Sequence, residues 1–147
     1  MKKLLFLFLL SSLVSFSQKK NFNLKKGYAV KGFDVVSYFS NNAKEGDKKY
    51  TTTKNGIKYK FVSQENLEAF NKNPKKYIPQ YGGYCAYAIG AKGKKVSINP
   101  ETFEIRDGKL YLFYNRGRTN TLEMWLNEGA EKLQKKADVN WQKIIQK

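Results

Sequence analysis

The chain contains no histidine and only one cysteine, Cys85, among its 147 residues. The absence of histidine excludes Ser–His–Asp triads, Cys–His dyads and histidine-ligated metal sites. A single cysteine excludes a disulfide within the molecule, so the stability of the fold has to come from packing. Arginine is also scarce. It occurs only at Arg106, Arg116 and Arg118, which leaves few residues suited to bidentate phosphate contacts.

Lysine, in contrast, is abundant. The chain has 28 lysines and arginines against 12 acidic residues, a formal net charge of +16. This balance favours polyanions, such as anionic polysaccharide, lipid headgroups or nucleic acid. The lysines occur in scattered pairs such as Lys48-Lys49 and Lys94-Lys95, without a long basic run, which is also typical of a solvated surface. We therefore expect contact with anionic envelope surfaces and no specific nucleic-acid partner.

The N-terminus has the pattern of an export signal. Lys2 and Lys3 precede an almost wholly apolar stretch from Leu4 to Leu13, and Ser15-Phe16-Ser17 gives the small-x-small pattern of a cleavage site. The apolar stretch is short for a membrane span. We predict a signal peptide over residues 1–17; an uncleaved anchor is the alternative.

Cleavage would leave an exported protein, periplasmic or extracellular, without a transmembrane anchor. Residues 18–27 are polar and lysine-rich, which predicts a flexible leader. Residues 28–147 have no internal repeat or linker, so we expect one domain. The aromatic fraction of 15% is enough to supply a substantial core.

Asn55-Gly56 predicts a first β-hairpin, because this pair is a strong two-residue turn signal. Apolar and lysine residues alternate on its C-terminal side. Counting back across the turn places Thr52 opposite Tyr59 and Tyr50 opposite Phe61. One face is then expected to be aromatic and buried, and the other lysine-coated.

Asp107-Gly108 predicts a second hairpin in the same way. The turn places Phe103 opposite Leu112 and Ile105 opposite Leu110. Apolar residues also occupy the alternate positions of the second strand, which indicates burial on both faces.

Helices are expected between and after the hairpins. Ser63 is a suitable N-cap for a helix that ends at Asn73-Pro74, and residues 120–146 have helical periodicity with a break near Asp138. The segment after Asp34 is compatible with a short helix or an extended strand. The chain is thus predicted to be an α+β protein, in which a small antiparallel sheet of two hairpins packs against short helices and a C-terminal helical segment.

Four sets of motifs follow one another in a fixed order. They are Val30–Phe39, Ser63–Phe70 with Asn73–Tyr77, Pro79–Tyr87, and Asp107–Asn115 with Ala137–Trp141. Together they resemble the exported form of the YHS-domain family. The resemblance implies a role in metal handling, with copper or zinc, because related domains accompany metal transporters. The chain departs from the family pattern in lacking histidine, in Val35 where proline is usual and in Phe113 where asparagine is frequent.

The run from Gln80 to Tyr87 surrounds Cys85 with glycines and tyrosines. If a helix starts after Cys85, its dipole would stabilise a thiolate; the alternative is a buried, inert thiol. The tyrosines either line a small-ligand pocket or complete the core. The candidate ligand-binding residues are Cys85, Tyr84, Tyr81, Tyr87, Asp34 and Tyr38.

No residue is assigned a catalytic role, because Cys85 has no histidine to act as its base. Beyond the predicted signal peptide, Cys85 and Met124 are the only soft metal donors, so Cys85 is a metal candidate mainly if two copies meet across a dimer. We interpret the chain as a non-enzymatic module without a cofactor that binds an unknown small ligand near Cys85. The alternatives are a copper or zinc accessory protein and a basic envelope-associated protein that binds anionic polymers.

Overall fold

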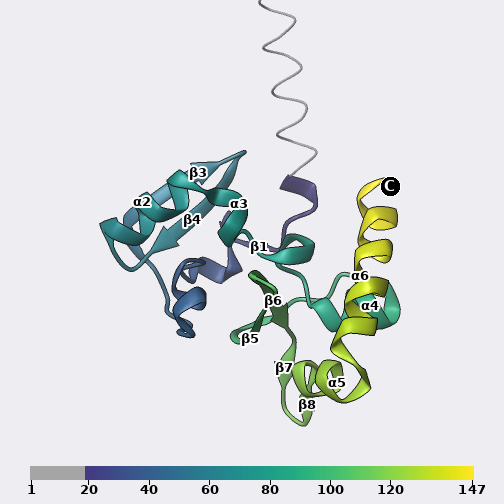
Figure 1. The fold of residues 1–147 in the computed structure, drawn as a ribbon. Helices are drawn as coiled ribbons and strands as arrows, with labels where there is room; N and C mark the ends of the chain where they lie inside the picture. Colours follow the sequence, from purple (N-terminus) through teal and green to yellow (C-terminus); the bar gives the residue numbers. More distant parts are fainter. Residues whose placement is uncertain (1–18) are drawn as a thin grey trace, which may run out of the picture.

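The computed structural model describes residues 19–147, so the signal peptide predicted over residues 1–17 lies outside the described residues. Small sheets pack against short helices and a longer C-terminal helix, which confirms the predicted α+β class. In Figure 1, the sheet of the first hairpin and the helices that follow it lie on one side of the molecule, the C-terminal helices lie on the other side, and the second hairpin lies between them.

The first sheet has four strands in the order β1-β2-β4-β3. They are β1 (Leu24–Lys25), β2 (Tyr28–Ala29), β3 (Asp47–Lys54) and β4 (Ile57–Phe61). The β3–β4 hairpin is antiparallel, as predicted, whereas β2 pairs with β4 in parallel. The sheet is therefore mixed, because residues 24–29 add β1 and β2, which the turn signals alone could not predict.

The register of the first hairpin is partly as predicted. Thr52 pairs with Tyr59, as expected, but Asp47 and not Tyr50 pairs with Phe61, because the register shifts between Asp47 and Thr51. Such a bulge inserts extra residues into one strand and leaves them unpaired. Counting residues from the turn assumes a regular ladder and fails beyond the bulge.

The second hairpin forms its own sheet, from β5 (Asn99–Arg106) and β6 (Lys109–Phe113). Phe103 pairs with Leu112 and Ile105 with Leu110, as predicted. All four residues from 110 to 113 are fully buried, so both faces of β6 are covered. A short pair, β7 (Asn115–Arg116) and β8 (Thr119–Asn120), follows.

The helical turns of the N-terminal half are short. They are η1 (Val30–Gly32), η2 (Ser37–Ser40), α2 (Gln64–Lys72) and α3 (Pro74–Tyr77). The Ser63 side chain accepts a hydrogen bond from the backbone N–H of Asn66, which confirms the predicted N-cap. Phe70 of α2 packs on the aromatic side chains of β4 and closes one face of the first sheet.

The C-terminal half contains η3 (Gln80–Gly83), α4 (Ala86–Lys92), α5 (Thr121–Glu128) and α6 (Ala130–Ile145). The predicted break near Asp138 is wrong, since α6 runs through that residue. The chain breaks at Gly129, whose φ of 106° lies outside the helical region. Asp138 therefore sits on a continuous helix.

One hydrophobic core joins the two halves, and fully buried aromatic side chains from both contribute to it. The largest are Trp125, Tyr38, Tyr59, Tyr111 and Phe61. This continuity is what a single domain requires. Among residues 19–147, no helix is long and apolar enough to cross a membrane.

Candidate functional site

Cys85 lies in the core, at the residue that precedes α4. Its side chain has no exposed surface, and its backbone N–H donates to the carbonyl of Val96. The sulfur lies 3.2 Å from Oγ1 of Thr121. Thr121 Oγ1 itself donates to the carbonyl of Tyr114 at 2.7 Å, so the thiol is the donor toward Thr121. Cys85 thus connects α4 to α5 and lines no described cavity.

Asp34 is also fully buried, and it is saturated with hydrogen bonds. Its Oδ1 accepts the backbone N–H groups of Val36 and Ser37 at 2.8 and 3.2 Å. Its Oδ2 accepts the N–H of Val62 and an amide N–H of Asn66, both at 2.8 Å. Asp34 joins the turn before η2 to the start of α2 and has no accessible face for a ligand.

The hydroxyl groups of the candidate tyrosines bond to four different parts of the chain. The Tyr38 hydroxyl donates to the carbonyl of Pro100, and the Tyr87 hydroxyl donates to Glu128 on α5. Burial, and then the charge of Asp34, raise the pKa of Tyr38 well above its usual value. The six candidates therefore do not form one site. Of the six, Tyr81 is the one that lines the main groove.

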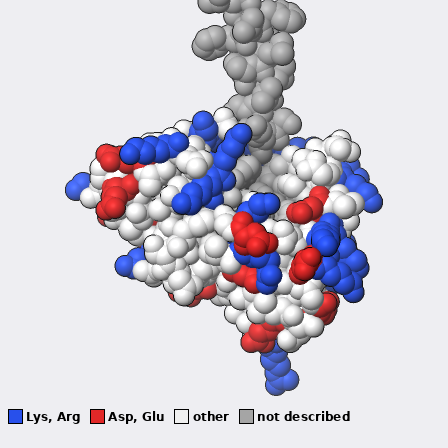
Figure 2. Space-filling view, viewed as in Figure 1, with Lys and Arg blue, Asp and Glu red and all other residues white. Residues whose placement is uncertain are grey.

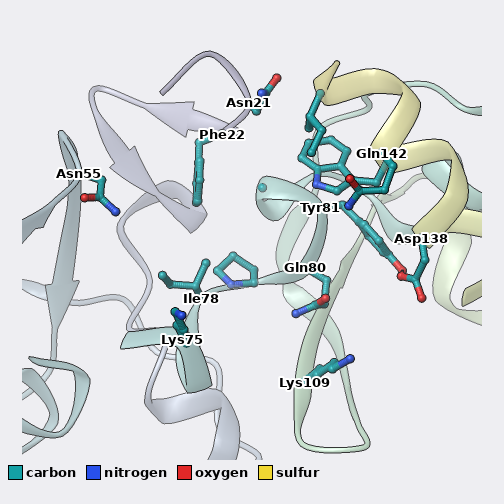
Figure 3. A pocket seen from close by; sticks show the side chains of 14 residues that line it. Asn21, Phe22, Asn55, Lys75, Ile78, Gln80, Tyr81, Lys109, Asp138 and Gln142 are labelled. Atoms are coloured by element: carbon teal, nitrogen blue, oxygen red, sulfur yellow. The ribbon is translucent and has the colours of Figure 1, made fainter. Parts of the chain in front are cut away.

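This groove has a volume of about 620 Å³ and opens between η3, α3 and α6. Figure 3 shows the labelled side chains around it. The lining residues are Asn21, Phe22, Asn55, Lys75, Ile78, Pro79, Gln80, Tyr81, Gly82, Lys109, Asp138, Trp141, Gln142 and Ile145. Sites for small organic ligands commonly have this size and this mixture of apolar walls and a few polar groups.

Tyr81 is aimed at α6 by the unusual backbone of η3. Three successive residues have left-handed φ values, 55° at Tyr81, 59° at Gly82 and 79° at Gly83. The Tyr81 hydroxyl donates to Oδ1 of Asp138 at 2.8 Å, as Figure 3 illustrates. Burial, and then this hydrogen bond, raise the pKa of Tyr81 well above its usual value. Tyr81 therefore stays protonated and keeps the Asp138 carboxylate in place.

Part of the predicted flexible leader closes the groove. A Cβ on Gly82 would lie 1.9 Å from the carbonyl oxygen of Asn21, so only glycine permits this contact. The backbone N–H of Asn23 donates to the Gly82 carbonyl at 2.8 Å, and the ammonium of Lys95 approaches Asn21 Oδ1 at 3.2 Å. The structure thus places the end of the leader against η3, where its hydrogen bonds hold it.

The aromatic wall of the groove is formed around Trp141. Its ring lies 6.1 Å from the ring of Tyr81 and 6.3 Å from the ring of Tyr84, between centroids. The ammonium of Lys95 lies 5.9 Å from the Trp141 ring and 5.4 Å from that of Tyr84. Burial and the charge of Lys20 lower the pKa of Lys95. Trp141 remains half-buried, so part of its ring is available to a ligand.

The polar side of the groove carries donors. Figure 3 shows Lys75 on one side of the view, Gln80 above Lys109 on the other, and Asp138 beside Tyr81. Within residues 19–147, neither lysine has a carboxylate within 4 Å. The single carboxylate of the groove, Asp138, already accepts one hydrogen bond from Tyr81. Two exposed ammonium groups and an amide are suited to an anion.

The described residues offer no metal centre. No three Asp, Glu, Cys or His side chains of this part of the chain cluster closely enough to hold an ion. Cys85 contacts a threonine hydroxyl, which is a poor partner for copper or zinc.

The key groove residues Asp138, Trp141, Lys75 and Lys109 were not among the sequence candidates. One signal existed: Asp138, Trp141 and Ile145 recur at i, i+3 and i+7, which places them on one face of α6. The two lysines gave no signal, because they come from distant segments of a lysine-rich chain.

No protein family, curated protein or solved structure matches the chain.

Proposed function

We propose that the protein is an exported, non-enzymatic binding module for a small organic anion, which it holds in the groove between η3 and α6. The observation that carries the proposal is the groove itself, with two free lysines on one side and aromatic rings on the other. Export rests on the signal pattern of residues 1–17. The proposed site includes Tyr81, which precedes Cys85 by four residues in the glycine-tyrosine motif.

Charge selects the ligand class. Lys75 and Lys109 are exposed and line the groove, and Gln80 adds an amide to the lining. A carboxylate or phosphate group would pair with these donors, whereas an ammonium group would meet two like charges. Figure 2 shows acidic side chains between the lysines and arginines on the visible face, so this surface is not uniformly basic.

The apolar wall selects for a ring or a short hydrocarbon. Trp141, Ile78 and Ile145 line the groove beside the polar groups. Their partly exposed surface would be covered by a ligand with an apolar body, at a gain of roughly 25 cal/mol per Å² buried. A small aromatic or aliphatic carboxylate satisfies both walls.

The position of Cys85 supports binding in preference to catalysis. A cysteine nucleophile needs access to substrate and a base, and the Cys85 thiol is buried and donates to Thr121. No other titratable pair in the groove resembles a nucleophile and its base, since Asp138 is held by the Tyr81 hydroxyl.

Benzoate is a suitable probe. The chain has two tryptophans, and their indole N–H resonances can be followed by NMR. Addition of benzoate should shift the Trp141 signal and leave the Trp125 signal in place, because Trp125 is fully buried and donates to Glu104. Trp141→Phe assigns the signal.

The charge argument is tested with two analogues and one matched variant. Benzamide and benzylammonium should bind much more weakly than benzoate. Lys109→Gln should weaken benzoate binding several-fold, whereas Lys92→Gln, an exposed lysine outside the groove, should not. Equal shifts with benzoate and benzamide, or no shift at Trp141, would refute the proposal.

A further inference from the structure

A second surface stands apart from the groove, on the outer face of the first sheet. Lys25 pairs with Tyr28, Tyr28 with Lys58, and Lys58 with Thr53. Directly paired residues point to the same side of a sheet, so these side chains form one row across all four strands. Lys60, paired with Thr51, lies two residues further along β4 on the same side. The lysine face is this set: Lys25, Tyr28, Thr51, Thr53, Lys58 and Lys60.

The opposite side of the same sheet belongs to the core. Ile57, Tyr59 and Phe61 alternate with the two lysines of β4 and are buried, and α2 covers them through Phe70. On the lysine face, Lys25 and Lys58 are exposed, whereas Lys60 is half-buried and its side chain lies beside Gly32 of η1. The exposed part of the face, around Lys25 and Lys58, is open to a partner.

Two like charges converge at its centre. The ammonium groups of Lys58 and Lys60 lie 5.7 and 4.3 Å from the centroid of the Tyr28 ring. Cation–π attraction holds them there, although the two charges repel each other. Within residues 19–147, the ion pairs are Arg106–Glu104 and Lys135–Glu131, so no carboxylate neutralises either lysine. An external anion would relieve this repulsion.

The strands of this sheet are strongly cationic as a group. The four strands contain six lysines and one acidic residue, Asp47, which lies at the far end of β3. The row from Lys25 to Thr53 spans three inter-strand gaps, roughly 14 Å at the usual strand spacing. This is longer than a single small anion and suits a ligand with repeated charges.

We propose that the lysine face binds a linear acidic polysaccharide, at a site independent of the groove. Its lysines would pair with the carboxylates or sulfates of successive sugars. The Thr53 hydroxyl would bond to a sugar hydroxyl, and the Thr51 hydroxyl, which already donates to the carbonyl of Lys48, can accept from one. The face lacks the features of a membrane-binding surface and of a nucleic-acid site, the two other kinds of polyanion site. Within residues 19–147, the large exposed apolar residues are Leu126, Val139 and Ile145, which lie on α5 and α6, so the described part of this sheet has no apolar side chain that would enter a lipid bilayer.

Nucleic acid is also disfavoured by the geometry. Single strands are usually bound by aromatic rings on which successive bases stack. The lysine face has one aromatic residue, Tyr28, and the ammonium of Lys60 already lies over its ring. The face therefore offers charge and hydroxyl groups without a free stacking platform.

The test compares two double variants of equal net charge. Lys58→Gln/Lys60→Gln removes the pair over Tyr28, and Lys132→Gln/Lys136→Gln removes two exposed lysines of α6. Binding to polygalacturonate is measured at physiological salt, with neutral dextran as the blank. We expect the dissociation constant to rise roughly tenfold for the first variant and about twofold or less for the second. Lys58→Arg/Lys60→Arg should retain binding, and equal thermal midpoints establish that the variants are folded.

Three outcomes would overturn the proposal. Equal weakening by the two double variants would mean that net charge alone drives binding. Tighter binding to single-stranded DNA than to polygalacturonate, with loss in Lys58→Gln/Lys60→Gln, would assign the face to nucleic acid. The same result with phosphatidylglycerol vesicles would assign it to a membrane.

Discussion

Asp34 and Asp138 are two carboxylates in contrasting environments. Asp34 has no exposed surface and accepts four hydrogen bonds, three of them from backbone N–H groups. Asp138 is exposed on α6 and accepts one hydrogen bond, from Tyr81. The first carboxylate organises the chain around it, and the second lies at the edge of a groove with acceptor capacity left over.

The difference shows that residue type alone does not tell whether a carboxylate is buried and fully hydrogen-bonded or lies accessible beside a groove. Asp34 lies within the motif Val30–Phe39 and was a sequence candidate, yet both of its carboxylate oxygens already accept hydrogen bonds within the fold. Asp138 lies within a helix and was expected to break it, yet it faces the groove. Free acceptor capacity, which depends on tertiary contacts, separates a buried structural carboxylate from one that stays accessible at the edge of a groove.

The largest effect is expected from Asp34→Ala. The substitution leaves the N–H groups of Val36, Ser37 and Val62, and the amide of Asn66, without their acceptor in a buried site. Each unsatisfied donor costs about 1–3 kcal/mol, and partial relaxation reduces the sum. We expect a loss of roughly 3 kcal/mol or more in the free energy of unfolding, measured by urea denaturation.

Asp47→Ala is the matched control. Asp47 is exposed, and its Oδ1 accepts a single backbone N–H, from Lys49 at 2.9 Å. Its loss should change the free energy of unfolding by about 0.5 kcal/mol or less. Similar losses in the two variants would contradict the view that Asp34 is a structural carboxylate.

The next prediction concerns Tyr111, whose pKa is influenced by Asp138. Tyr111 is fully buried, and its hydroxyl is the one buried side-chain polar atom of residues 19–147 without a hydrogen-bond partner. Burial, followed by the charge of Asp138, raises its pKa to about 12. A hydroxyl with no partner contributes little to stability, so Tyr111→Phe should be neutral or stabilising at pH 7.

The pH dependence of Tyr111 follows from the direction of this shift. An unfolded tyrosine ionises near pH 10. Because the folded pKa is higher, the stabilisation linked to Tyr111 is fully present below pH 10 and falls as the pH rises toward 12. Urea denaturation at pH 9 to 11.5 should show a shallower loss of stability for Tyr111→Phe than for the wild type. Parallel curves would mean that the hydroxyl has an ordinary pKa in the fold.

Local sequence signals were sufficient to predict the two hairpin turns and the N-cap of α2. Asn55-Gly56 and Asp107-Gly108 form the predicted turns, and Ser63 caps α2, because each depends on residues within a few positions. The bulge between Asp47 and Thr51 was missed because it depends on packing across the sheet.

The site was less accessible to sequence reasoning. The residues of the glycine-tyrosine motif divide between two environments: Tyr81 lines the candidate groove, and Cys85 lies in the core. The rest of the groove comes from α3, β6 and α6, whose meeting depends on the whole fold. Lys75 and Lys109 differ from the other lysines only in their position at the groove, which the tertiary fold determines.

The smallest effect on stability is expected for Asp138→Asn, which should also strengthen the binding of benzoate. The asparagine Oδ1 can still accept the Tyr81 hydroxyl proton, and the position is exposed, so the free energy of unfolding should change by about 0.5 kcal/mol or less. Loss of the negative charge should strengthen benzoate binding about two- to threefold, because one repulsive group leaves the groove. Asp138→Ala should give a similar gain in affinity but a larger loss of stability, since it also leaves Tyr81 without its acceptor. Weaker benzoate binding in Asp138→Asn would mean that Asp138 contacts the ligand as an acceptor, and the groove would then suit a ligand that donates a proton at that point.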